Sequence, residues 1–137
     1  MSAGLVVDAS VTAAWFLPDE GSPYTEAVLQ ATADSDVWVP AIWLLEMGNL
    51  LLNAQRRRRI DDAKRRELVA AAAALRLRID REPVPMPELD ALAARHALTA
   101  YDAAYLELAL RRKLPIATTD AALLKAMTAA GVKPADL

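Results

Sequence analysis

The chain has 137 residues, of which 55% are hydrophobic and 25% are charged, and its formal net charge at pH 7 is −2. This composition excludes a disordered chain, and we expect a single compact domain over residues 1–137. Cysteine is absent, which excludes disulfides, thiolate metal ligands and a cysteine nucleophile. Neither a leader segment nor an apolar run of membrane-spanning length stands out, so we expect a cytoplasmic protein without membrane contact.

The amino-terminal part of the chain alternates between strand and helix patterns. An apolar run predicts a strand over 5–8, and a short helix follows over 10–17, where Pro18 ends it. A helix is predicted over 23–33, and the proline near its start is typical of the first turn of a helix. Branched and aromatic residues favour a second strand over 37–40.

Two long helical patterns fill the middle of the chain. The first covers 41–58, and the second, rich in alanine, covers 61–77. The short connection between them predicts a helical hairpin. An irregular third strand is expected over 79–84.

The last part of the chain returns to alternation. Helices are predicted over 87–97 and 100–112, a strand over 114–118 and a helix over 121–130, with Gly131 ending that helix before a short last strand. Alternating strands and helices predict an α/β fold, with a parallel sheet covered by helices on both faces.

Glu46 is an acidic residue inside an apolar helix. Its neighbours one helical turn away are Ile42 and Leu50, so we place it on the buried stripe of that helix. An unpaired ionised carboxylate in such a position costs several kcal/mol. A bound divalent cation removes this cost, and Glu46 is therefore a candidate metal ligand.

Three further acids, Asp8, Asp102 and Asp120, stand at predicted helix starts. Each has a structural explanation as a helix cap or as part of a capping box with Thr99. However, Asp8 and Asp120 also follow strands, and open α/β sheets bind ligands at the carboxyl ends of strands. Together with Glu46 these acids predict a metal site, while the capping explanation stays open for each acid taken alone.

Positive charge is concentrated in one region. Residues 56–81 contain ten basic and four acidic residues, although the whole chain is slightly acidic. The run Arg56–Arg59 suggests contact with phosphate groups. The alternative is that these arginines complement a helix dipole and that Lys64 to Arg66 form a solvated helix face. Both interpretations stay open.

Other conspicuous side chains favour structural roles. His96 lies near a helix end, where it complements the helix dipole, and one histidine cannot form a histidine-rich zinc site. Trp15, Trp38 and Trp43 fall in apolar stretches and are expected in the core. Glu107 lies five residues after Asp102, off its helical face. No glycine-rich phosphate loop is present.

The segment from Leu98 to Asp120, with Thr99-Ala100-Tyr101-Asp102 and Thr118-Thr119-Asp120, resembles the signature of PIN-domain ribonucleases. Within that superfamily it is most similar to the VapC-type toxins of bacterial toxin–antitoxin pairs. The amino-terminal Val7-Asp8-Ala9-Ser10 and the apolar helix that carries Glu46 match the same pattern. The resemblance covers essentially the whole chain.

This resemblance implies a PIN-like three-layer α/β sandwich, in which a central twisted parallel sheet has helices on both faces. It implies an acidic pocket that binds Mg²⁺, or alternatively Mn²⁺. By matching position, the acids that hold metal and act in catalysis are Asp8, Glu46, Asp102 and Asp120. The supporting side chains are Thr118, Ser10 and Asn49. The implied reaction is metal-dependent endonucleolytic hydrolysis of RNA, which leaves a 3′-hydroxyl and a 5′-phosphate.

The implied partners are an RNA substrate, a cognate antitoxin and a second copy of the chain in a homodimer. One alternative is a phosphoryl-transfer domain of the receiver or haloacid-dehalogenase type. It fits less well, because Ser10 stands where the dehalogenase type has a second aspartate, and Thr118-Thr119-Asp120 stands where a receiver has a lysine. The other alternative is a PIN-like binding module without catalysis, which the presence of all four acids disfavours.

Overall fold

A computed structural model describes residues 4–137, and its centre is a four-stranded parallel sheet. The strand order is β3-β2-β1-β4, and each neighbouring pair runs parallel. The strands are β1 (Leu5–Val7), β2 (Val37–Pro40), β3 (Arg78–Asp80) and β4 (Ile116–Ala117). The predicted α/β class and parallel sheet are confirmed.

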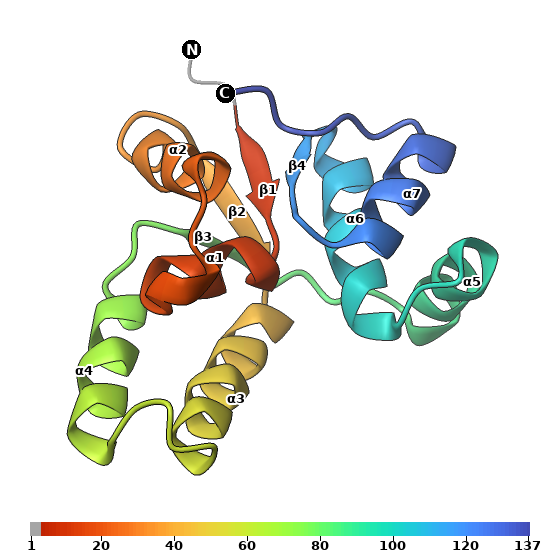
Figure 1. Ribbon diagram of the computed structural model, residues 1–137. Helices are drawn as coiled ribbons and strands as arrows, with labels where there is room; N and C mark the ends of the chain where they lie inside the picture. The colour runs from red at the N-terminus through yellow and green to blue at the C-terminus, as the bar shows by residue number, and fades with distance from the viewer. Residues whose placement is uncertain (1–3) are drawn as a thin grey trace.

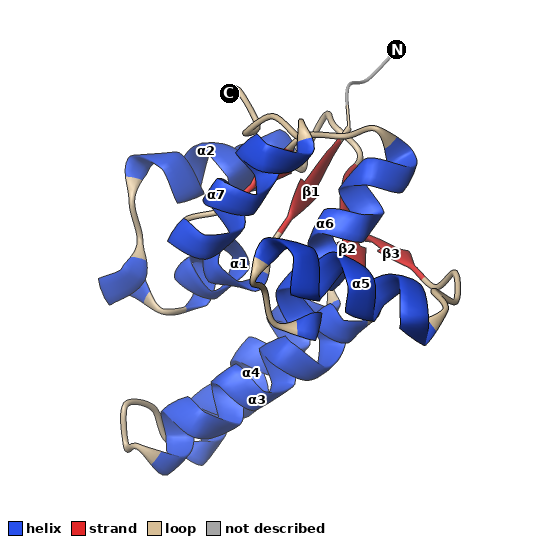
Figure 2. Cartoon of the chain, turned by 90° about the vertical axis from the view of Figure 1, so that its right-hand side faces the viewer, coloured by secondary structure: helices blue, strands red, loops and turns tan. Residues whose placement is uncertain are grey.

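Helices cover both faces of this sheet. They are α1 (Ala9–Phe16), α2 (Pro23–Ala31), α3 (Ile42–Arg56), α4 (Asp62–Ala73), α5 (Met86–His96), α6 (Ala100–Arg112) and α7 (Ala121–Ala130), with a 3₁₀ turn η1 (Pro18–Glu20). Helix α6 packs on β1, β2 and β4 and carries α5, while α1 and α2 pack together on the other side (Figures 1 and 2). Across residues 4–137, no helix combines the length and apolarity needed to cross a bilayer.

The core surrounds β1 on both faces of the sheet, and α6 covers one of them. Val6 and Val7 of β1 are fully buried, and α6 contributes five buried residues, Ala103, Tyr105, Leu106, Leu108 and Ala109. Burying apolar side chains from both elements holds the sheet and α6 together at about 25 cal/mol per Å² removed from water. This packing fixes where the amino-terminal end of α6, and so Asp102, lies relative to the end of β1.

The helical hairpin of α3 and α4 extends away from the carboxyl ends of the strands, and the start of β1 and the carboxyl terminus lie at the opposite end of the molecule (Figure 1). The predicted hairpin is thus confirmed. The second helix is shorter than predicted, because it ends at Ala73 rather than at 77. Ala74 caps it, and the chain leaves the helix to enter β3.

The sheet edges also differ from the prediction. Strand β3 covers Arg78–Asp80 and does not continue to 84, because Pro83 and Pro85 lack the N–H that a ladder needs. Strand β4 is limited to two residues. The predicted last strand is reduced to one bridge between Ile116 and Pro134, with Ala135 N donating to Ile116 O at 2.9 Å.

Asp80, at the end of β3, is a buried acid that the sequence analysis did not identify. Arg111 donates to its carboxylate at 3.0 and 3.1 Å, and Arg112 donates at 2.9 Å. Burial favours the neutral form, but these hydrogen bonds and the arginine charges lower the pKa of Asp80 overall. The Arg112 guanidinium also lies 3.6 Å from the centre of the Trp38 ring. The pairing ties the sheet edge to the end of α6.

Replacing Asp80 by alanine is expected to destabilise the fold by roughly 3 kcal/mol, because the change removes the shared partner of two arginines at a buried position. Asp36→Ala is the matched control. Asp36 forms a solvent-exposed pair with Arg78 at 3.0 Å, and such pairs contribute about 0–1 kcal/mol. Urea unfolding measures both values, and equal losses for the two variants would contradict this role of Asp80.

Candidate functional site

Two of the four predicted acids emerge side by side at the carboxyl ends of neighbouring strands. Val7 of β1 pairs with Ala117 of β4, and Asp8 N donates to Ala117 O at 3.2 Å. The chain therefore places Asp8 directly beside Thr118, and Asp120 follows two residues later. This is the strand-end arrangement that the sequence predicted.

Asp8 is 4% exposed and accepts hydrogen bonds on both carboxylate oxygens. Its Oδ1 accepts from Ser10 N at 3.1 Å, Ser10 Oγ at 2.5 Å and Val11 N at 3.3 Å, and its Oδ2 accepts from Thr118 Oγ1 at 2.6 Å. Asp8 is thus the N-cap of α1 as well as a member of the acidic group. Burial raises the pKa of Asp8, and the hydrogen bonds from Ser10, Thr118 and Val11 oppose that rise.

Thr118 and Ser10 link the ends of β1 and β4. Thr118 Oγ1 accepts from Asp120 N at 2.9 Å while it donates to Asp8, and Ser10 Oγ accepts from Thr119 N at 3.2 Å. Asp120 also caps α7, because its Oδ2 accepts from Leu123 N at 2.8 Å. The two hydroxyl residues therefore hold Asp8 and the loop before Asp120 in fixed positions.

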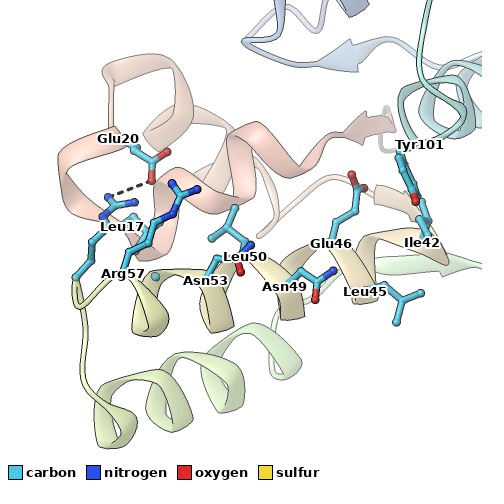
Figure 3. Close-up of a pocket in the computed structure, with 12 residues that line it drawn as sticks. Leu17, Glu20, Ile42, Leu45, Glu46, Asn49, Leu50, Asn53, Arg57 and Tyr101 are labelled. Carbon is cyan, nitrogen blue, oxygen red and sulfur yellow. Dashed lines mark ion pairs between the residues drawn. The ribbon is translucent and has the colours of Figure 1, made fainter.

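Glu46 lies beside the buried stripe of α3 and not within it, which corrects the prediction. The buried stripe consists of Trp43, Met47, Leu51 and Ala54, whereas Glu46 is half-buried. Successive residues of a helix are rotated by about 100°, so Glu46, Leu50 and Asn53 form a neighbouring stripe. This stripe lines a groove along α3, shown in Figure 3.

Tyr105 orients Glu46 and was missed in the sequence. Its hydroxyl donates to Glu46 Oε1 at 2.6 Å from α6, where Tyr105 is 1% exposed. Burial raises the pKa of Glu46, the bond from Tyr105 lowers it, and the charges of Asp102 and Asp8 raise it further. A signal was available, because a buried tyrosine one helical turn after Asp102 needs a partner for its hydroxyl.

Asp102 occupies the first turn of α6. Thr99 caps this helix by accepting from Asp102 N at 3.1 Å, and the Asp102 carboxylate is left half-buried. Burial raises the pKa of Asp102, and the negative charges of Asp120 and Asp8 raise it further. A capping box would also need the Asp102 carboxylate to accept from Thr99 N, and that bond is not formed among residues 4–137.

The four acids therefore share one electrostatic environment. Burial is the main cause of the raised pKa values of Asp8, Glu46 and Asp102, and the negative charge of at least one other member of the group raises each of these pKa values further. Among residues 4–137, no lysine, arginine or histidine forms an ion pair with any of the four acids. This charge is uncompensated, in contrast to that of Asp80.

The oxygen donors fit a hard divalent cation. Mg²⁺ prefers carboxylate oxygens and water, and it bonds directly to only one or two protein carboxylates while it keeps several waters. In the described part of the chain, no three acidic or histidine side chains converge closely enough to hold one ion between them. Asp8, Glu46, Asp102 and Asp120 supply carboxylate oxygens of the kind that such a cation binds, directly or through its waters.

Comparison with known proteins identifies the family. The family model for the PIN domain matches residues 5–128. The chain belongs to the PIN-domain family. Such domains are generally nucleases, which implies a nucleic-acid substrate and does not favour the phosphoryl-transfer alternative.

A solved structure supports the PIN fold. The crystal structure of PAE2754 from Pyrobaculum aerophilum is similar to this chain with a TM-score of 0.70 and 23% sequence identity. The match covers 91% of this chain and 79% of that one. At this identity the similarity concerns the fold alone, and it agrees with the predicted PIN-like sandwich. A search of curated proteins gave no significant match.

Three other side chains that the sequence analysis discussed lie apart from the four acids. Asn49 lines the α3 groove but forms no hydrogen bond with the acids within residues 4–137. His96 lies in the last turn of α5, as expected. Glu107 pairs with Arg111 at 2.6 Å and lies outside the acidic group.

All three tryptophans serve structural contacts. Trp43 is buried and donates to Thr12 Oγ1 at 3.0 Å, which links α3 to α1. Trp15 is half-buried and donates to Thr25 O at 2.8 Å. Trp38 is half-buried, with Arg112 over its ring. The expected core role is confirmed for Trp43, and the other two pack at the edge of the core.

Removing the Tyr105 hydroxyl is expected to move the acidic limb of the pH–activity profile. In Tyr105→Phe, Glu46 loses the hydrogen bond that lowers its pKa, so a higher pH is needed to ionise it. We expect a loss of roughly 10- to 100-fold in cleavage near neutral pH, with partial recovery in alkaline buffer. A uniform loss at every pH would instead indicate general structural damage.

Proposed function

We propose that this PIN domain is a Mg²⁺- or Mn²⁺-dependent endoribonuclease that acts as the toxin of a toxin–antitoxin pair. The observation that carries the proposal is the group of four acids at the carboxyl end of the sheet of a PIN domain, none of which has a basic partner among residues 4–137. Membership of the PIN-domain family is the reason for proposing a nucleic-acid substrate. The resemblance to VapC-type toxins supplies the choice of RNA and the toxin role.

In this proposal the protein contributes negatively charged carboxylates that are held in fixed positions. Asp8 is held by Ser10 and Thr118, and Glu46 is held by Tyr105, so that their carboxylates keep fixed orientations. A bound divalent cation supplies a coordinated water of lowered pKa and stabilises charge on the scissile phosphate and its leaving 3′ oxygen. No separate general base is needed, and Asp102 and Asp120 complete the ligand group.

The proposal extends to assembly and location. We propose one domain over residues 1–137 that works in the cytoplasm as a homodimer. Leu44, Leu45 and Met86 are exposed apolar residues, and a dimer contact would cover side chains of this kind. A cognate antitoxin would place an arginine or lysine toward the acids, with apolar side chains around it.

Expression in a bacterial host tests the toxin role. The wild-type protein alone is expected to arrest growth, whereas Asp8→Asn at the same protein level is not, because cleavage depends on the acidic group. Co-expression of the gene adjacent to this one in its host is expected to restore growth and to yield a co-purifying complex. Harmless expression of a protein that cleaves RNA in vitro would reject the toxin role and leave the ribonuclease proposal standing.

A further inference from the structure

The groove along α3 changes in character from its acidic end to its basic end. Glu46 lies near the end formed by Ile42 and Tyr101, Asn49 and Asn53 follow along α3, and Arg57 lies near the other end (Figure 3). The groove has a volume of about 620 Å³. These side chains share one side of the helix, and with a rise of about 1.5 Å per residue Arg57 lies about 17 Å from Glu46 along the axis.

Arg57 differs from its neighbour Arg59, although both line the groove. Arg59 pairs with Asp19 at 2.8 Å and with Glu20 at 3.6 Å, and both Arg59 and Glu20 line the groove. Arg57 is exposed and forms no ion pair with any residue from 4 to 137. Its guanidinium is therefore free to bind an anion, whereas that of Arg59 holds the groove wall.

The structure separates two arginines of the basic run by their positions. Arg56 belongs to the last turn of α3, where it complements the helix dipole, and it does not line the groove. Arg57 does line it. The amides of Asn49 and Asn53 between the two ends supply both donors and acceptors, which suits a ligand that carries hydroxyl and phosphate oxygens.

We infer that the α3 groove holds the RNA strand that flanks the cut site, and that Arg57 binds a backbone phosphate a few nucleotides from the scissile one. The inference rests on the proposed ribonuclease function and assigns a second contact within the same site. The anionic backbone complements the free cation of Arg57, and the distance from Glu46 allows one strand to reach both ends. Glu20 faces the same end and opposes the strand by its charge.

RNA binding by three variants tests this assignment. Each variant is the full chain with one substitution in addition to Asp8→Asn, which prevents cleavage. The probe is a fluorescein-labelled twelve-nucleotide oligouridylate, and anisotropy is measured over a salt series. Arg57→Ala is expected to weaken binding by roughly tenfold and to reduce the slope of log K against log salt by about 0.7, the loss of one single-strand phosphate contact. Arg56→Ala removes the same charge one residue away and is expected to change the slope little. Glu20→Gln is expected to strengthen binding.

A cleavage series separates this inference from the proposed function. With Mn²⁺ and active protein, Arg57→Ala is expected to slow cleavage of the twelve-nucleotide substrate by a larger factor than cleavage of a dinucleotide, which is too short to reach Arg57. Absence of any cleavage by the wild type would reject the proposed function. The binding series would still test whether RNA binds in the groove at Arg57. If Arg57→Ala and Arg56→Ala bind and cleave RNA equally well, the inference is wrong. A protein partner would then be the remaining candidate ligand of the groove.

Discussion

Replacing any one of Asp8, Glu46, Asp102 and Asp120 by its amide is expected to remove most RNA cleavage and to leave the fold intact. An amide keeps the size of each side chain but removes the charge that holds a divalent cation. The loss should exceed the roughly 100-fold effect that is typical of removing a supporting group around a metal. Cleavage of a labelled RNA with Mg²⁺ measures the effect, and circular dichroism checks the fold.

Asp90→Asn is the control for this series. Asp90 is an exposed residue of α5 and forms no ion pair within residues 4–137, so its loss is expected to leave cleavage unchanged. Glu46→Gln is the decisive variant, because Glu46 lies outside the buried stripe of α3 and accepts a hydrogen bond from Tyr105 that orients it. Wild-type cleavage by Glu46→Gln would remove Glu46 from the site.

The course of the chain could be predicted because the patterns that define it are local. Windows of a few residues are enough to recognise the strand that ends in Asp8 and the strand before Asp120. The apolar helices between them are recognised in the same way. Parallel pairing then follows from alternation, which brings Asp8 and Thr118 together although 110 residues separate them. The helix and strand ends were less accurate. The second hairpin helix ends at Ala73, where the chain turns toward β3.

The side-chain partners could not be read from the sequence. Tyr105 and Glu46 are 59 residues apart and meet only because α6 and α3 approach the same end of the sheet. The rotation of α3 about its axis decides whether Glu46 or Met47 faces the core, and packing of Trp43 against Thr12 sets that rotation. Asp80 is the last residue of its strand, whereas Asp8 directly follows its own, and the arginine partners of Asp80 come from α6 and give it a structural role.

Mn²⁺ is expected to raise the melting temperature, because the ion binds the folded acidic group and not the unfolded chain. At a concentration one hundred times its dissociation constant, one bound ion adds about 2.7 kcal/mol. For a domain of this size, that corresponds to a shift of about 10 °C. Differential scanning calorimetry with and without Mn²⁺ measures the shift, and Glu46→Gln is expected to reduce it.

Without metal, the same acids should oppose folding at neutral pH. Burial and mutual repulsion raise the pKa values of Asp8, Glu46 and Asp102 above those of the unfolded chain. The folded state therefore holds protons that the unfolded state has lost, so the contribution of these groups to stability falls as pH rises from about 4 through the raised pKa values. Removing one charge relieves repulsion, and metal-free Glu46→Gln or Asp102→Asn is expected to melt above the metal-free wild type.

The two effects together predict that the Mn²⁺ shift grows with pH. Protons and the cation compete for the same carboxylates, so acid weakens metal binding while it stabilises the metal-free fold. We expect a small shift at pH 5 and a larger one at pH 7.5, and the difference should shrink in Glu46→Gln. Calcium is expected to stabilise the protein too but to support cleavage poorly, because its looser coordination positions water less well. A melting temperature that millimolar Mn²⁺ leaves unchanged at pH 7.5 would contradict the metal site.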